Sequence, residues 1–340
     1  MNPAIRLPLS AFAVLGAGLA GSGLLLYGLL KIHSRIMNRM GPMYAGRFHG
    51  IGQPIAEVLK PIQKEDIVPA SADGPVFRLA PLVAIFTAFL GLGVIPIGPG
   101  LVAADTELGL FFVLAIGALS TIAIVMAAYG AQSKFTLIGG LRAVGQIIAY
   151  ELPVVLGAVS VAMLAGSLNL TEIVQLQDPW YLPNVVNPLG AIVFVILLLA
   201  SFAEVMWNPF DMPVAESEIV TGPLTEYSGM RFIFFYIAEF VHVVLYCALI
   251  TILFFGGWNG PHVPFLPDAL QAPLIFTGKM VMFGVFFIWV RFTMPRLRED
   301  QLQKLAWKGL IPLGLLNILL IALYKVGVFG QLFDAIKGLL

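Results

Sequence analysis

The sequence carries little charge for its length. Charged residues make up 11% of the 340 residues and apolar residues 59%, whereas a soluble domain carries about 25% charge. So little polar surface cannot cover a water-soluble globule. The apolar residues also form long blocks, several of which reach the roughly 20 residues that a membrane-spanning helix needs. The composition therefore predicts a polytopic integral membrane protein.

Cysteine and net charge are also scarce. A single cysteine, Cys247, excludes an intrachain disulfide and any cysteine-ligated cluster within this chain. The net charge is zero and no basic tract occurs, so nothing indicates nucleic-acid binding. The sequence has no phosphate-binding glycine loop, no metal-spaced His/Cys set and no nucleophile triad. Any iron–sulfur or flavin chemistry must lie in a partner chain.

Eight apolar segments predict an all-α fold of about eight transmembrane helices in one membrane domain, residues 1–340. The first segment is longer than the 7–15-residue core of a signal peptide and is interpreted as a retained helix. The segment 189–205 is short, and we consider that it could be tilted or partly re-entrant. The predicted spans are 7–30, 78–97, 108–129, 142–165, 189–205, 231–256, 273–293 and 308–329.

Lysine and arginine predict the orientation of these spans. Fifteen of the 19 basic residues lie on alternate connections, and the remaining four are Arg6, Lys279, Lys325 and Lys337. Basic connections face the cytoplasm, so both termini are expected on the non-cytoplasmic side. The connections 39–77 and 204–230 are then long cytoplasmic loops, where function concentrates.

The loop 203–231 is unusually acidic, with five carboxylates against one base. Its prolines Pro209 and Pro213 prevent one regular helix. A solvated loop is the simpler interpretation, but apolar residues alternate with the acids and favour a partly buried cluster. Crowded, desolvated carboxylates can hold exchangeable protons. The acids are Glu204, Asp211, Glu216, Glu218 and Glu226.

Further ionisable residues lie within the predicted spans. Such a group costs several kcal/mol at bilayer depth unless it is paired, and it often marks a pathway. We interpret Glu151 and Glu239 as proton-path residues. His242, three residues after Glu239, is either a second relay residue or simply the partner of Glu239. Lys279 is expected to snorkel toward the membrane surface.

Two other patterns are notable. Arg142, Gln146 and Tyr150 recur at every fourth residue and stack on one helical face. Residues 52–67 can form an amphipathic helix whose apolar side is Ile55, Val58, Leu59 and Ile62. Such a helix can lie in the membrane interface, although an ordinary surface linker is the alternative interpretation.

Five segments, in order along the chain, resemble one known family. QPIAEVLKPIQKEDIVPASAD, LRAVGQIIAYELP, NPFDMPVAESEIV, TEYSGMRF and IWVRFTMPRLREDQL are similar to the signature segments of the NuoH-type membrane component of NADH-quinone oxidoreductase, the respiratory complex I. They cover the chain from about residue 39 to 310.

The resemblance implies a proton-translocating enzyme subunit in the inner or plasma membrane of a prokaryote. It implies that quinone, either ubiquinone or menaquinone, is the substrate, with nothing bound covalently, and that iron–sulfur clusters and flavin lie only in partner subunits. The implied partners are small and antiporter-like membrane subunits, the peripheral iron–sulfur and hydrogenase-like subunits, and the lipid bilayer.

The resemblance also implies roles for individual residues. A proton path would use Glu151, Glu204, Asp211, Glu216, Glu218 and Glu239, with Glu226 beside it. Residues of the quinone chamber would be Gln53, Glu57, Arg142, Gln146, Tyr150 and Phe210.

The chain departs from the family pattern where charge is expected near the chamber. Leu29–Leu30 replaces Glu–Arg, Met43–Tyr44 and Met206–Trp207 each replace Asn–Arg, and Pro223–Leu224 replaces Tyr–His. These changes indicate a divergent member with another quinone, donor or coupling step. Alternative hypotheses are a hydrogenase-type membrane anchor without quinone, a stand-alone ion or solute transporter, and a degenerate scaffold.

Overall fold

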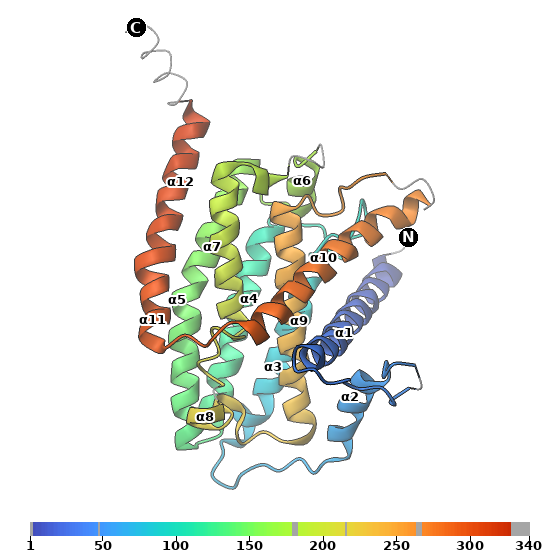
Figure 1. Ribbon diagram of the computed structural model, residues 1–340, viewed down its shortest axis with the longest axis vertical. Helices are drawn as coiled ribbons and strands as arrows, with labels where there is room; N and C mark the ends of the chain where they lie inside the picture. Colours follow the sequence, from blue (N-terminus) through green and yellow to red (C-terminus); the bar gives the residue numbers. More distant parts are fainter. Residues whose placement is uncertain (1–2, 47, 179–182, 215, 263–266, 328–340) are drawn as a thin grey trace, which may run out of the picture.

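The chain folds into a bundle of helices (Figure 1). A computed structural model describes all residues except 1–2, 47, 179–182, 215, 263–266 and 328–340. The described residues contain no strand beyond one isolated bridge between Gly98 and Leu101. The predicted all-α fold is confirmed.

The helical elements follow one another along the chain with connections of very different lengths. In chain order they are α1 (Pro3–Ile36), α2 (Gln53–Gln63), α3 (Gly74–Leu92), α4 (Gly109–Gly130), α5 (Lys134–Ala165), α6 (Leu170–Gln175), η1 (Asn184–Val186), α7 (Pro188–Glu204), α8 (Glu216–Ile219), η2 (Gly222–Leu224), α9 (Gly229–Phe254), α10 (Asp268–Thr293), α11 (Glu299–Lys304), η3 (Leu305–Leu310) and α12 (Ile311–Val326).

Within the described residues, seven helical segments are long and apolar enough to cross a membrane. The last of them joins α11, η3 and α12 into one segment, Glu299–Val326. The predicted span 189–205 corresponds to α7, which has 17 residues. At 1.5 Å per residue, α7 is about 26 Å long, a little short of the roughly 30 Å hydrocarbon layer.

Several helices extend beyond the apolar stretches that predicted them. α5 begins at Lys134, eight residues before the predicted start at 142, and α1 continues to Ile36. Hydropathy detects only the apolar part of a helix, whereas the backbone stays helical through its polar ends. Arg142 therefore lies two turns inside α5, not at its start.

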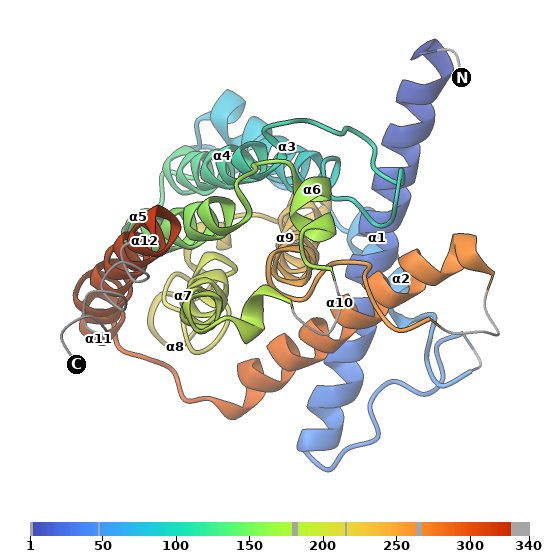
Figure 2. The same ribbon diagram turned by 90° about the horizontal axis from the view of Figure 1, so that it is seen from above.

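Helix α9 occupies the centre of the bundle, with the other long helices around it (Figure 2). In its most apolar stretch, 83% of the residues are buried, a far larger share than in the outer helices α1 or α12. Glu239 and His242 therefore lie on the most enclosed helix. An ionisable group there needs a protein partner or must be neutral.

The loop between α7 and α9 is packed against the bundle. The Tyr227 hydroxyl donates to the carbonyl oxygen of Phe77 at 3.1 Å, and the two rings stack at 4.1 Å. Gly222 has φ +56°, and a Cβ there would collide with the carbonyl oxygen of Pro213. A Cβ on Gly139 of α5 would lie 2.6 Å from the Gly222 Cα. Glycine at both positions thus lets the loop and α5 touch.

Lys279 of α10 has partners within the chain. Its Nζ donates to three backbone carbonyl oxygens, of Phe255 at 2.6 Å, Gly257 at 3.0 Å and Asn259 at 2.6 Å. These carbonyls follow the end of α9, where acceptors lack helical partners and the helix dipole favours a cation. Lys279 therefore ties α10 to the end of the central helix α9 by three hydrogen bonds.

We predict that Lys279→Met lowers the stability of the bundle. Hydrogen bonds to a charged group contribute about 1.5–3 kcal/mol each, and the lysine's own desolvation offsets part of that. We expect a net loss of about 2–4 kcal/mol, measured as a lower midpoint of thermal unfolding in detergent. Lys325→Met, at an exposed position of α12, is the control. An equal midpoint of thermal unfolding in both variants would mean that the hydrogen bonds of Lys279 do not stabilise the bundle.

Candidate functional site

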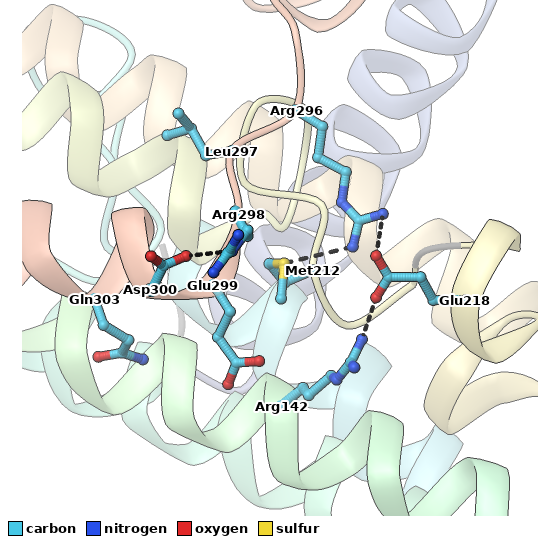
Figure 3. Close-up of a pocket in the computed structure, with 9 residues that line it drawn as sticks. All are labelled: Arg142, Met212, Glu218, Arg296, Leu297, Arg298, Glu299, Asp300 and Gln303. Carbon is cyan, nitrogen blue, oxygen red and sulfur yellow. Dashed lines mark hydrogen bonds and ion pairs between the residues drawn. The ribbon is translucent and has the colours of Figure 1, made fainter.

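A pocket of about 580 Å³ lies at the end of the bundle that carries the long loops. Figure 3 shows its lining, which comes from α5, the loop after α7 and the segment from Arg296 into α11. This volume is in the range of small-molecule sites. The lining is mostly charged, with Arg142, Glu218, Arg296, Arg298, Glu299 and Asp300.

Glu218 bridges two arginines across this pocket. Arg142 Nη1 lies 2.6 Å from Glu218 Oε2, and Arg296 Nη1 lies 3.3 Å from Glu218 Oε1 (Figure 3). The hydrogen bond from Arg142, with the charge of Arg296, lowers the pKa of the Glu218 carboxyl. Glu218 is therefore ionised at neutral pH, and its pairs join α5 to the segment after α10.

A second, much smaller cavity lies inside the bundle. Its volume is about 20 Å³, close to that needed for one water molecule. Its polar lining is Glu151 of α5, Glu204 of α7, and His242 and Tyr246 of α9, while α4 contributes apolar residues. Glu204 Oε1 is buried and has no hydrogen-bond partner among the described residues. No arginine or lysine of the described chain lines this cavity.

Glu239 belongs to a third arrangement. Trp207 Nε1 donates to Glu239 Oε1 at 2.5 Å, and Arg291 Nη1 lies 3.7 Å from the same oxygen. The Arg291 guanidinium also lies over the Trp207 ring, 4.3 Å from its centroid, a cation–π distance. Glu239 thus has an arginine partner, whereas no arginine or lysine of the described chain lines the cavity of Glu151 and Glu204.

Comparisons with known proteins identify the same family as the five signature segments. The family described as NADH dehydrogenase matches residues 9–322. The H subunit of the NADH-quinone oxidoreductase of Anoxybacillus flavithermus is 42% identical over 321 residues, which cover 92% of this chain and 94% of that protein. The same proteins of Bacillus cereus and Bacillus thuringiensis are each 42% identical over 308 residues, which cover 89% of this chain and 90% of each relative. The chain belongs to the NuoH family of NADH-quinone oxidoreductase.

The six residues that the NuoH pattern assigns to a quinone chamber do not meet in one pocket. Only Arg142 lines the 580 Å³ pocket. Gln146 Nε2 instead donates to the carbonyl oxygens of Ala203 at 2.7 Å and Phe210 at 2.8 Å, and the Tyr150 hydroxyl donates to that of Leu302 at 2.9 Å.

The other three chamber residues are also accounted for. Phe210 is buried and its ring packs edge-to-face on Tyr150. Gln53 and Glu57 bond to each other on α2 at 2.6 Å. Within this chain, the three buried residues Gln146, Tyr150 and Phe210 hold the loop after α7 and helix α11 against α5.

The loop acids likewise separate. Glu204 faces the inner cavity and Glu218 the outer pocket, while Asp211 and Glu226 are half-buried in the loop. The side chain of Glu216 lies outside the described part of the structure. Among the described residues, no group of three or more His, Cys, Asp and Glu side chains could hold a metal ion.

His242 is not the partner of Glu239, which was one of the two interpretations. Its Nδ1 lies 2.8 Å from the Ala238 carbonyl oxygen, and its side chain lines the inner cavity. Residues three apart on a helix differ by about 60° in direction, enough to face different neighbours.

The actual partners of the acids were missed from the sequence. Trp207 and Arg291 hold Glu239, and Arg296 holds Glu218. Arg291 and Arg296 belong to a basic segment that membrane orientation alone explains, so no local pattern indicates a second role for them.

We predict that Glu218→Gln loosens the loop at neutral pH and not in acid. Because the pKa of Glu218 is lowered in the folded chain, its ion pairs stabilise the fold above the usual glutamate pKa of about 4.3. That contribution is lost as the pH falls through the lowered value. Hydrogen exchange of residues 205–228 should be about two- to fivefold faster in the variant at pH 7, and equal in both proteins in acid.

The control for this comparison is Glu299→Gln. Glu299 lines the same pocket but makes no ion pair with the described residues. In the Glu299→Gln protein, residues 205–228 should exchange their amide hydrogens at the same rate as in the unsubstituted chain at every pH. If the two variants behaved alike, the ion pairs of Glu218 would not be holding the loop.

Proposed function

We propose that this chain is a membrane component of a complex I-type donor:quinone oxidoreductase, in which it couples quinone reduction to proton translocation. Family membership supports the enzyme complex. The observation that carries the coupling role is the inner cavity, which Glu151 and Glu204 both line and to which the described chain contributes no arginine or lysine. Two carboxyls in one small apolar site cannot both ionise cheaply, so one holds an exchangeable proton.

In this proposal quinone is the substrate and binds between α2, the loop after α7 and the peripheral partner subunits. The chain lacks a cysteine-ligated cluster site, so iron–sulfur clusters and flavin belong to those partners. The outer pocket supplies Arg142 and Arg296, which can stabilise negative charge on a reduced quinone head group. The acidic path then continues from Glu204 and Glu151 toward the antiporter-like subunits.

The two sites are physically connected through Gln146. It binds the carbonyl of Ala203, next to Glu204, and the carbonyl of Phe210 in the loop. Arg142, one turn earlier on α5, binds Glu218 in the outer pocket. A change at Glu218 can therefore move the loop, and the loop is bonded to the end of α7 beside Glu204.

We predict that Glu151→Gln and Glu204→Gln each reduce quinone-dependent proton pumping at least tenfold, because an amide cannot release a proton. The measurement is dye quenching in inverted membrane vesicles that contain the assembled complex. The control is Glu172→Gln, an exposed acid on α6 that bonds Ser167. Full pumping in both cavity variants would refute the coupling role.

Helix α2 is proposed to frame the quinone entrance in the membrane interface. Ile55, Leu59 and Ile62 are 65%, 52% and 52% exposed, so they form an apolar side that the rest of the chain does not cover. Lipid can cover such a side, and a long isoprenoid tail can pass along it.

We predict that Leu59→Asn raises the KM for a long-tailed quinone roughly fivefold, since about half of a leucine contact is worth about 1 kcal/mol. The KM for a short-tailed quinone should not change. Lys64→Gln, just past the C-terminal end of α2, is the control. An equal effect of Leu59→Asn on both quinones would mean that α2 does not guide the tail.

A further inference from the structure

The ring of His242 has a defined arrangement of donor and acceptor. Its Nδ1 lies 2.8 Å from the Ala238 carbonyl oxygen. A carbonyl oxygen can only accept a hydrogen bond, so Nδ1 carries the hydrogen. In the neutral ring, Nε2 is then a bare acceptor. Nε2 is buried and has no partner among the described residues, which is uncommon for a buried polar atom.

The space that His242 lines contains complementary groups. Glu204 Oε1, from α7, is also buried without a partner among the described residues and lines the same 20 Å³ cavity. The other titratable groups of its lining are Glu151 and Tyr246. On the α4 side, a Cβ added to Gly117 would lie 3.9 Å from the Tyr246 hydroxyl, so glycine leaves this space open. The cavity thus holds a potential donor, an acceptor and room for one connecting water molecule.

We propose that His242 is a proton-carrying residue of the inner cavity, which accepts a proton from Glu204 through one water molecule and passes it to Glu151. This inference rests on the proposed coupling function and adds a third, basic member to its two carboxyls. The Glu204 O–H bond breaks as the water takes that proton, and the water's own proton forms a bond to Nε2. The products are a carboxylate and an imidazolium ion, which neutralise one another within the cavity.

Onward transfer restores the starting state of the ring. The imidazolium gives up its Nε2 proton to the ionised Glu151, and Nδ1 keeps its hydrogen on Ala238 throughout. Both carboxyls are ionised while the ring is charged, and one of them is ionised before and after that stage. The imidazolium therefore always has a carboxylate beside it, whereas an unpaired cation in the apolar bundle would cost several kcal/mol. An imidazole suits the role because its unperturbed pKa lies near neutrality.

Two variants of the assembled complex test His242. His242→Gln keeps a polar side chain but cannot ionise, and His242→Asn keeps a donor for the Ala238 carbonyl. Each should assemble in the membrane, lower dye-quench pumping at least tenfold, and lose the imidazole bands from the redox-induced infrared difference spectrum of ring-labelled protein. A purely structural role of His242 would not remove those bands selectively. If one of the two variants fails to assemble, the pumping and the infrared bands of the other variant test the proposal.

The matched control is His33→Gln on α1. His33 also has a buried ring nitrogen without a partner among the described residues, and its ring packs on Phe292 at 4.1 Å, but it does not line the cavity. It should keep both pumping and the infrared bands. Normal pumping in the His242 variants, or unchanged bands, would overturn the inference.

Glu204→Gln, tested alongside, separates this inference from the coupling function. If that variant stops pumping and the His242 variants do not, only the histidine's role fails. If neither matters, the coupling function fails as well.

Discussion

The structure depends on one constraint: an ionisable side chain inside a membrane bundle must be paired, or it must share a proton. The chain meets it in three ways. The ammonium group of Lys279 donates hydrogen bonds to three backbone carbonyl oxygens at the end of α9. Glu239 is paired with Arg291 and Trp207. Glu151 and Glu204 have no base of the described chain in their cavity other than His242, so sharing a proton is the route left to them, and the proposed coupling function rests on this difference.

The same constraint explains how the acidic loop is built. A loop carrying five carboxylates would stay in water unless other contacts held it against the helices. Tyr227, Gln146 and the close approach of Gly139 to Gly222 supply those contacts. Glu218 then meets two arginines at the surface, while Glu204 stays inside at the end of α7. One short segment thus connects an ionised acid in the outer pocket with an acid in the inner cavity.

The sequence predicts the long helices well because apolar blocks of about 20 residues have few alternatives to spanning a bilayer. The amphipathic residues 52–67 likewise predict α2 (Gln53–Gln63). Prediction fails where the direction of a single side chain decides the outcome. Glu239 and His242 lie three residues apart, yet one faces Arg291 and the other the inner cavity.

Lys279 shows a second reason why sequence patterns do not identify partners. Snorkelling is the general expectation for a lysine within a span, and only the turn after α9 places three carbonyls within its reach. Partners that come from a distant part of the chain, as Arg291 does for Glu239, leave no local pattern. The resemblance to NuoH implies roles for particular acids, but it does not say which of them are paired.

The distance between the two sites decides how they can communicate. Arg142 and Glu151 are nine residues apart on α5, or about 14 Å along the helix. At an effective dielectric constant near 20, a new charge about 4 Å from a carboxyl is worth about 4 kcal/mol, or roughly three pKa units. At about 14 Å it is worth only about 1 kcal/mol. A charge in the outer pocket therefore cannot switch Glu151 by its field alone. The proposed function therefore requires a mechanical contribution as well, and the bonds from Gln146 to Ala203 and Phe210 are contacts that can transmit it.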